Sequence, residues 1–203
     1  MHKYKRRLLA GFLIVLFFGT MIVYAPCFLI YSSNYRKADA IILFLGPDFT
    51  ARQKEAYKMI KEEISDYLII PAYHKIYKIV DGKPIKYYSP NSSSVDSVYK
   101  KSLITPFPYF YEDTHIEIIE ARKIMSDYGL KSAIFVSSPY HMRRIKVIVT
   151  RVFNSDESNF YFVPTSFEKA PRYFWELSWT DWRKVGREYG KMLWFAVYGL
   201  WTE

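Results

Sequence analysis

The chain has 203 residues, half of them hydrophobic, and a formal net charge of +9. This length and apolar content suffice for one folded domain with an appendage and exclude a disordered chain. The basic residues are scattered, and the sequence has no zinc-ligand spacing, RNP-like motif or basic-region helix, so nucleic acid is not an expected partner. Its single cysteine, Cys27, excludes an intramolecular disulfide.

The first feature in chain order is an uncharged stretch of 23 residues from Leu8 to Ile30. At 1.5 Å per residue it is long enough to cross a hydrocarbon core of about 30 Å. Four basic residues precede it, whereas only Arg36 and Lys37 follow closely, so the positive-inside rule places the N-terminus in the cytoplasm. A cleaved signal peptide is the alternative, but the apolar run is too long and Ala25-Pro26-Cys27 is a poor cleavage site.

We therefore expect a single-pass protein of the inner, cytoplasmic membrane, with its C-terminal domain outside the cytoplasm, in the periplasm. The membrane lipid bilayer is then an expected partner. The expected organisation is a basic cytoplasmic tail at 1–7, a transmembrane helix at 8–30, a linker at 31–37 and one domain at 38–203.

Within that domain, short apolar runs alternate with amphipathic segments of helical period. The periodicity predicts strands at 38–46, 67–71, 133–136 and 160–163, and helices at 49–64, 114–129, 139–152 and 179–201. This alternation favours an α/β fold: a three-layer, doubly wound, mostly parallel sheet with helices on both faces. The last helix is expected to pack on the domain, although Trp194, Tyr198 and Trp201 leave an interfacial helix open.

Residues 73–108 are less regular, and we expect an elaborated region over one edge of the sheet. The Asp81-Gly82 step between two alternating runs, 75–80 and 85–88, predicts a β-hairpin. A polar loop at 91–94 and a proline-containing break at 105–108 follow.

The most informative stretch runs from Ser132 to Arg144. Here a buried strand feeds a helix start that has serine at the cap and Pro139 at the first helical position. Such a start directs free backbone N–H groups to the carboxyl edge of the sheet, and His141, Arg143 and Arg144 lie just inside it. The pattern predicts an anion-binding site; a capped surface helix is the plainer alternative.

Further polar residues are expected at the same edge of the sheet. His141 and Arg144 share a helix face, and arginine binds phosphate through a bidentate fork. The expected ligand-binding residues are Gly46, Asp48, Arg52, Thr114, Ser137, Ser138 and Arg144. His141 is the candidate general acid or base and Glu117 its orienting partner, unless His141 only packs and Glu117 only completes a capping box with Thr114. Four histidines without close spacing predict no metal site.

Several of these motifs, in this order, resemble the YdcF/SanA/ElyC-like family. The matching segments are the first strand at 38–46, Arg52, the helix start at 112–121, the signature at 137–144, and Trp182, Glu188 and Lys191 in the last helix. The resemblance implies a Rossmann-like fold and a role in cell-envelope maintenance, such as peptidoglycan or surface-polysaccharide metabolism. Two glycine-rich turns of the family retain only Gly46 here, which implies an altered pocket.

The resemblance and the anchor together favour a phosphate-bearing ligand, either a lipid-carrier phosphate or a nucleotide-like molecule. Three classes of function stay open. They are an enzyme acting on a phosphorylated or lipid-linked envelope precursor, a binding module without turnover for a nucleotide-like ligand of the S-adenosylmethionine type, and a structural partner of envelope synthesis machinery. The sequence indicates no particular cofactor.

Overall fold

The computed structural model describes residues 2–86, 110–154 and 159–200. Its helices are α1 (His2–Leu29), α2 (Phe49–Lys61), α3 (Asp113–Asp127), α4 (Met142–Phe153) and α5 (Trp179–Gly199). Its strands are β1 (Ala38–Leu43), β2 (Ser65–Ile70), β3 (Lys75–Val80), β4 (Lys83–Lys86), β5 (Ala133–Ser137) and β6 (Phe160–Pro164). Three 3₁₀ turns are η1 (Pro71–Tyr73), η2 (Pro139–His141) and η4 (Phe174–Glu176).

The strands form one sheet in the order β4-β3-β2-β1-β5-β6. Strands β2, β1, β5 and β6 run parallel to one another. Strand β3 pairs antiparallel with β2, and β4 pairs antiparallel with β3. The α/β class with a mostly parallel sheet is thus confirmed. Since the chain runs from β1 to β2 on one side and to β5 on the other, the strand order reverses between β1 and β5. The carboxyl ends of strands at such a reversal are where open α/β sheets bind ligands.

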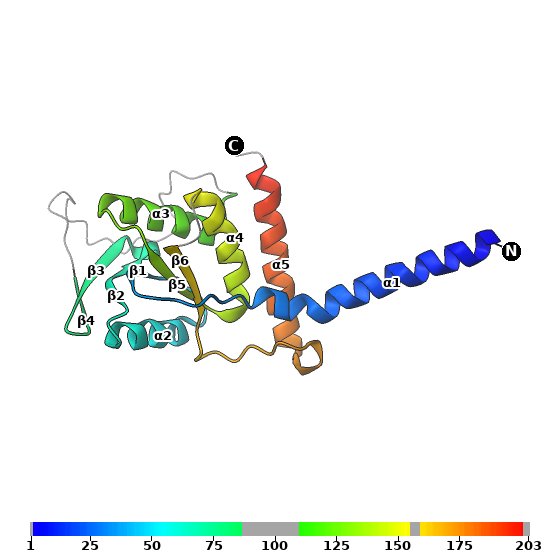
Figure 1. Cartoon of the computed structure of the whole chain (residues 1–203), viewed down its shortest axis with the longest axis horizontal. Helices are drawn as coiled ribbons and strands as arrows, with labels where there is room; N and C mark the ends of the chain where they lie inside the picture. Colours follow the sequence, from blue (N-terminus) through cyan, green and yellow to red (C-terminus); the bar gives the residue numbers. More distant parts are fainter. Residues whose placement is uncertain (1, 87–109, 155–158, 201–203) are drawn as a thin grey trace.

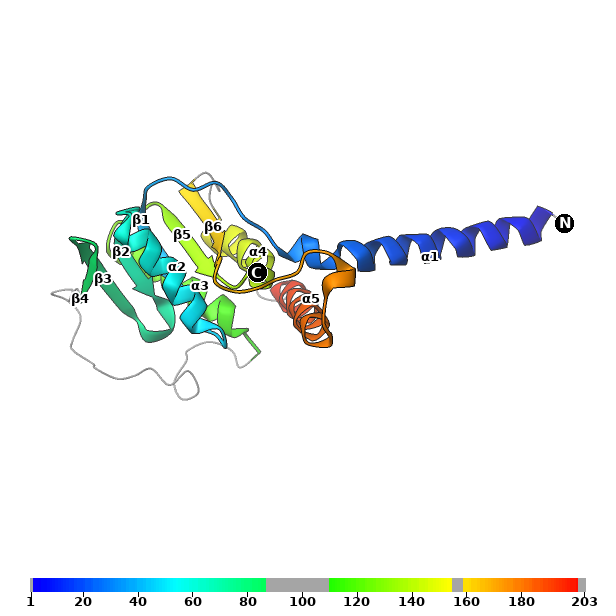
Figure 2. The ribbon, with the colours of Figure 1, turned by 90° about the horizontal axis from the view of Figure 1, so that it is seen from below.

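Helices cover both faces of the sheet, as Figures 1 and 2 show. Residues of β1 alternate between the two faces, because successive strand side chains point to opposite sides. Ile41 and Leu43 pack with Met59 of α2 on one face, whereas Ile42 packs with Ile118 of α3 on the other. Burial on both faces explains the near-continuous apolar run of this strand.

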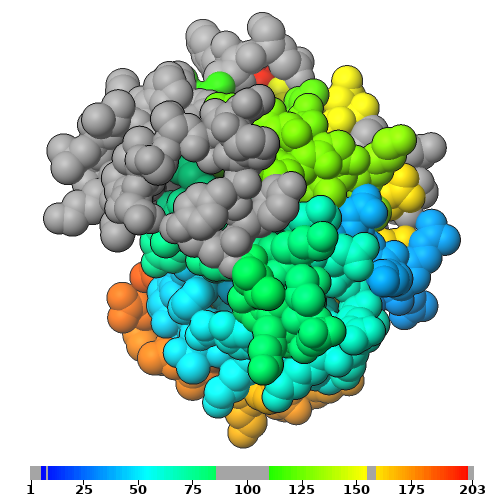
Figure 3. All heavy atoms as spheres, turned by 90° about the vertical axis from the view of Figure 1, so that its left-hand side faces the viewer, coloured from blue at the N-terminus to red at the C-terminus, as the bar shows by residue number. Residues whose placement is uncertain are grey.

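The hairpin predicted from the runs 75–80 and 85–88 is present as β3 and β4, as far as the described residues extend, to Lys86. Asp81 and Gly82 both have positive φ, 50° and 64°, as a tight two-residue turn between twisted strands requires. The hairpin extends the sheet beyond β2, at the end of the domain farthest from α1 in Figure 1, and it faces the viewer in Figure 3. The loop expected at 91–94 and the break expected at 105–108 lie outside the described residues.

The predicted cap at Thr114 is wrong, and the one at Ser138 is confirmed in position but makes no side-chain cap hydrogen bond. Helix α3 begins at Asp113 after Glu112, so Thr114 lies within the first turn, where its hydroxyl accepts a hydrogen bond from Arg144. Ser138 does precede the η2 turn, but its hydroxyl makes no cap hydrogen bond because it accepts one from Arg52. In both cases a long-range arginine takes the oxygen that a local cap would use.

Helix α1 leaves the domain as a rod with its apolar side chains exposed (Figure 1). By length and composition its segment Leu9–Leu29, with mean hydropathy 2.3, is able to cross a membrane. Its last turn packs on the domain: Leu29 is fully buried, and the Tyr189 hydroxyl donates to the Ala25 carbonyl at 3.1 Å. Beyond it, residues 31–37 run along β6, where the backbone N–H of Ser33 donates to the Phe162 carbonyl.

Candidate functional site

Arg52 links α2 to the carboxyl ends of β1 and β5. Beyond Leu43 the chain leaves the sheet, so the following carbonyls accept hydrogen bonds from a side chain. Nη1 of Arg52 donates to the Leu45 carbonyl at 2.7 Å and to the Phe44 carbonyl at 3.3 Å, and Nε donates to Ser138 Oγ at 3.0 Å. Two of the predicted ligand-binding residues, Arg52 and Ser138, therefore meet at the point where the strand order reverses.

Gly46 makes room for this guanidinium. A Cβ built on Gly46 would lie 2.6 Å from both Nη1 and Nη2 of Arg52, far inside van der Waals contact. Because Arg52 is only 2 % exposed and held by three hydrogen bonds, it cannot move aside cheaply. Gly46, the one glycine kept from the expected glycine-rich turn, thus leaves the space that the Arg52 guanidinium occupies.

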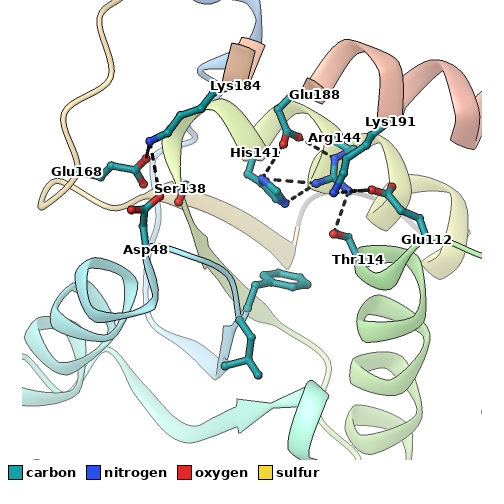
Figure 4. A network of polar contacts seen from close by, with 12 residues as sticks. Asp48, Glu112, Thr114, Ser138, His141, Arg144, Glu168, Lys184, Glu188 and Lys191 are labelled. Atoms are coloured by element: carbon teal, nitrogen blue, oxygen red, sulfur yellow. Dashed lines mark hydrogen bonds and ion pairs between the residues drawn. The ribbon is translucent and has the colours of Figure 1, made fainter. Parts of the chain in front are cut away.

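Arg144 is the centre of a second cluster, shown in Figure 4. Its side chain is fully buried on α4, and protein groups surround its guanidinium. Nε donates to Glu188 of α5 at 2.8 Å, and Nη1 donates to Thr114 at 2.9 Å and to Glu112. Nη2 donates to the His141 ring, one helical turn away. With Glu112 also paired to Lys191 at 3.3 Å, this cluster joins α3, α4 and α5.

His141 is held as a neutral imidazole within this cluster. Its Nδ1 lies 3.1 Å from a Glu188 oxygen and its Nε2 faces Arg144, so Nδ1 carries the proton and Nε2 accepts. Burial lowers the pKa of His141 to about 4, and the charge of Arg144 adds to this against the opposing effect of Glu188. Burial opposes ionisation of Glu188, yet the hydrogen bond from His141 and the charge of Arg144 bring its pKa down to about 2.

The two arginine clusters share carboxylates. Burial lowers the pKa of Arg52, and the negative charges of Glu168, Glu117, Asp48 and Glu188 oppose this shift. Glu117, buried on α3, is therefore close enough to act on Arg52. Five carboxylates therefore face four cations across the two clusters, so the site carries no excess of positive charge. The carboxylates are those of Asp48, Glu112, Glu117, Glu168 and Glu188, and the cations are Arg52, Arg144, Lys184 and Lys191.

Some polar atoms at the reversal point have unused bonding capacity. Ser137 is fully buried at the end of β5, and its Oγ has no hydrogen-bond partner among the residues described. Within residues 2–86, 110–154 and 159–200, Nη2 of Arg52 has no hydrogen-bond partner either, whereas its Nε and Nη1 have partners. Both residues are buried at this edge of the sheet, Ser137 fully and Arg52 with 2 % of its surface exposed.

Asp48 lies apart from the Arg144 cluster. It precedes α2 without capping it through its side chain and pairs with Lys184 of α5 at 3.6 Å. Lys184 also pairs with Glu168 at 3.1 Å, and this trio lies away from His141 in Figure 4. Arg143 points elsewhere: its Nε donates to the Phe28 carbonyl of α1. The contacts thus divide the predicted site residues into two groups, Arg52 with Gly46 and Ser138, and Arg144 with Thr114 and His141. Glu117 and Asp48 act on Arg52 through their charge.

Sequence reasoning missed Glu112, Lys191, Lys184 and Glu168 as members of these clusters. Glu112 directly precedes Asp113-Thr114, so a search for carboxylates beside the expected helix start would have found it. Lys184 lies one turn before Glu188 on the same helix, but only the tertiary fold brings it to Asp48. Glu168 follows β6 and carried no local signal.

Comparison with protein-family models, curated proteins and solved structures found no match. Among residues 2–86, 110–154 and 159–200, no group of three or more His, Cys, Asp or Glu side chains is arranged to hold a metal ion. Function therefore has to be argued from the geometry of the two arginine clusters.

Proposed function

We propose that the chain is a membrane-anchored, Rossmann-like domain that binds a phosphate-bearing ligand at the carboxyl ends of β1 and β5, with a role in cell-envelope maintenance. The envelope role follows from the resemblance to the YdcF/SanA/ElyC-like family. The single observation that carries the ligand site is the unused bonding capacity of two buried groups at the carboxyl ends of β1 and β5. Among the described residues, neither Nη2 of Arg52 nor Oγ of Ser137 has a hydrogen-bond partner, and both residues lie where open α/β sheets bind ligands.

Arg144 has a structural role beside this site. Its guanidinium is enclosed by Glu188, Glu112, Thr114 and His141, so its role in the proposal is to hold α3, α4 and α5 together around the pocket edge. Arg52 is then the anion ligand. Because the site carries no excess of positive charge, we expect binding to depend on its directed hydrogen bonds and to vary weakly with salt.

We propose binding without acid–base catalysis by His141. A general base works best with a pKa near the working pH, whereas the pKa of His141 is about 4 and its Nε2 already accepts from Arg144. The alternative, turnover at this histidine, requires that the ligand first displace Arg144. Product formation from a lipid-linked phosphate would support that alternative, provided that His141→Ala abolishes it.

A binding measurement on the full chain in mild detergent tests the ligand. Farnesyl phosphate and uridine monophosphate represent the lipid-carrier and nucleotide-like classes, and farnesol and uridine are their phosphate-free controls. We expect binding of a phosphate probe that is lost in Arg52→Gln and retained in Arg122→Gln, an arginine bonded to the Val152 carbonyl. Equal affinity for phosphate and phosphate-free probes, or retention in Arg52→Gln, would refute the site.

We also propose that α1 spans the cytoplasmic membrane with the N-terminus inside and the α/β domain outside the cytoplasm. The support is the apolar segment Leu9–Leu29 and the basic residues before it. Reporter fusions at the C-terminus, one active only in the cytoplasm and one only outside it, test this topology. Activity of the cytoplasmic reporter alone would reverse it.

A further inference from the structure

We infer that α5 and the turn before it form a second membrane contact, which seats the domain on the lipid surface beside the anchor. This inference rests on the proposed insertion of α1. Its partner is the headgroup layer of a bilayer that contains anionic lipid. Two exposed patches form the contact: the aromatic turn (Tyr173, Phe174, Trp175 and Trp179) and the apolar half of α5 (Leu193, Val197 and Leu200).

Both patches lie on the side of the domain from which α1 departs. Figures 1 and 2 agree that α5 and the η4 turn form this side, with α5 running across the direction of α1. Contacts fix the arrangement: Phe28 of α1 stacks on Tyr189 of α5, and Leu29 is buried against Val185. A membrane crossed by α1 therefore faces the outer side of α5.

The length of α1 brings the membrane up to these patches. The exposed stretch from Leu9 to Tyr24 has sixteen residues, which span about 24 Å at 1.5 Å each. A hydrocarbon core is about 30 Å thick. If exposed Arg7 lies just outside the core at the N-terminal end of the helix, the core reaches past Tyr24 to about Phe28. That is the level at which the helix packs against the domain. The surfaces around this level then meet the interfacial layer of the bilayer.

The chemistry of the patches fits that layer. Trp175 and Trp179 are 65 % and 77 % exposed, an unusual state for tryptophan in water and a favoured one at membrane interfaces. Tyr173 stacks on Trp175 at 4.9 Å, so the rings form one apolar surface. Exposed basic side chains lie near the aromatic turn, Arg172 before it and Arg183 with Arg187 in the first half of α5, against one exposed acidic residue, Glu176, so the net charge there favours anionic headgroups.

The same helix carries the Arg144 cluster on its opposite face. Glu188 and Lys191 of α5 point inward to Arg144 and Glu112, whereas Leu193 and Val197 point outward. A helix with side chains is about 10–12 Å across, so the Arg144 cluster lies roughly that far from the lipid surface. The ligand site proposed at Arg52 lies on the far side of that cluster from the lipid.

Depth measurement with single spin labels tests the inference. The full chain carries Cys27→Ser and one cysteine at a time, reconstituted in vesicles of phosphatidylethanolamine and phosphatidylglycerol. Relaxation by oxygen, which concentrates in lipid, is compared with relaxation by a water-soluble nickel chelate. The test positions are Trp175→Cys and Val197→Cys, Leu16→Cys reports the anchor, and exposed Tyr57→Cys and Ile85→Cys serve as water-exposed controls.

We expect the oxygen-to-nickel ratio at 175 and 197 to be several-fold above that at 57 and 85, and below that at 16. A deep label at 16 with values at 175 and 197 equal to the controls would overturn the second contact and leave the anchor standing. A water-exposed label at 16 would overturn both. If Trp175→Cys fails to fold, quenching of the native tryptophans by brominated lipid gives the answer: it should fall in Trp179→Tyr, and an unchanged signal would overturn the contact.

Discussion

Replacing Gly46 by alanine tests whether Arg52 is fixed in place. The new Cβ would lie 2.6 Å from two guanidinium nitrogens, so either Arg52 or the turn must shift. Overpacking costs about 1–3 kcal/mol, and loss of a charge-assisted hydrogen bond costs about 1.5–3 kcal/mol more. We expect a loss of about 3 kcal/mol in the free energy of unfolding, which lowers the melting temperature by about 6–12 °C for a domain of this size.

The assay is thermal and urea unfolding of the full chain in mild detergent. Gly186→Ala is the matched control, because nothing lies within 4 Å of its added Cβ in α5, and alanine there should stabilise by up to about 1 kcal/mol. Lysine lacks the Nη1 and Nη2 atoms that the new Cβ would meet. In an Arg52→Lys background, Gly46→Ala should therefore lower the free energy of unfolding by at least about 1 kcal/mol less than it does in the unsubstituted chain. A Gly46→Ala chain that melts with the unsubstituted one, or costs that add in the double variant, would refute the fixed arginine.

Three further predictions use the same unfolding assay. Glu188→Gln should cost about 3 kcal/mol, since fully buried Arg144 keeps Glu112 but loses one of its two carboxylate partners, while exposed Glu62→Gln should change little; a small cost for both would contradict a buried ion pair. His115 is buried on α3, where its Nδ1 lies 3.1 Å from the Tyr198 hydroxyl, and burial lowers its pKa to about 4 as it does for His141. Stability should therefore fall on the order of 2 kcal/mol per histidine from pH 7 to pH 5, because both pKa values are near 6.5 when unfolded and the unfolded chain takes up the protons; a flat profile would argue against two neutral buried histidines. Tyr189→Phe should lose about 1 kcal/mol through its bond to the Ala25 carbonyl, with Tyr57→Phe neutral, and equal effects would show that α1 is not held there.

The sequence predicted most of the fold because the signals were local. Continuous apolar runs gave β1, β5 and β6, since these strands are buried on both faces, and the Asp81-Gly82 step gave the β3–β4 hairpin. Gly129 marks the end of α3 as expected, with φ at 65° and Leu130 N–H bonded to the Met125 carbonyl. Each of these features depends on neighbours in the chain or on simple periodicity.

The candidate site was less predictable because its bonds cross the fold. Periodicity placed Glu188 on the last helix, but the sequence was compatible both with an ion pair on the helix surface and with one inside the fold. The packing of α5 against α4 directs Glu188 to Arg144. Thr114 and Ser138 carried correct cap patterns, yet two arginines remote in sequence compete for their hydroxyls. Arg144 itself was predicted from its helix face as a ligand group, and whether any ligand reaches it stays a prediction.

The path of residues 31–37 along β6 has a consequence for preparing this domain without its anchor. Strand β6 ends the sheet order, so its outer edge offers unpaired backbone groups to other chains unless something covers it. The backbone N–H of Ser33 donates to the Phe162 carbonyl, and the Ser33 hydroxyl accepts from the Phe162 N–H. Tyr31 packs on the Phe162 ring. A truncated chain that begins at residue 38 would expose the edge of β6 and self-associate. One that begins near Ala25 keeps residues 31–37, which cover that edge.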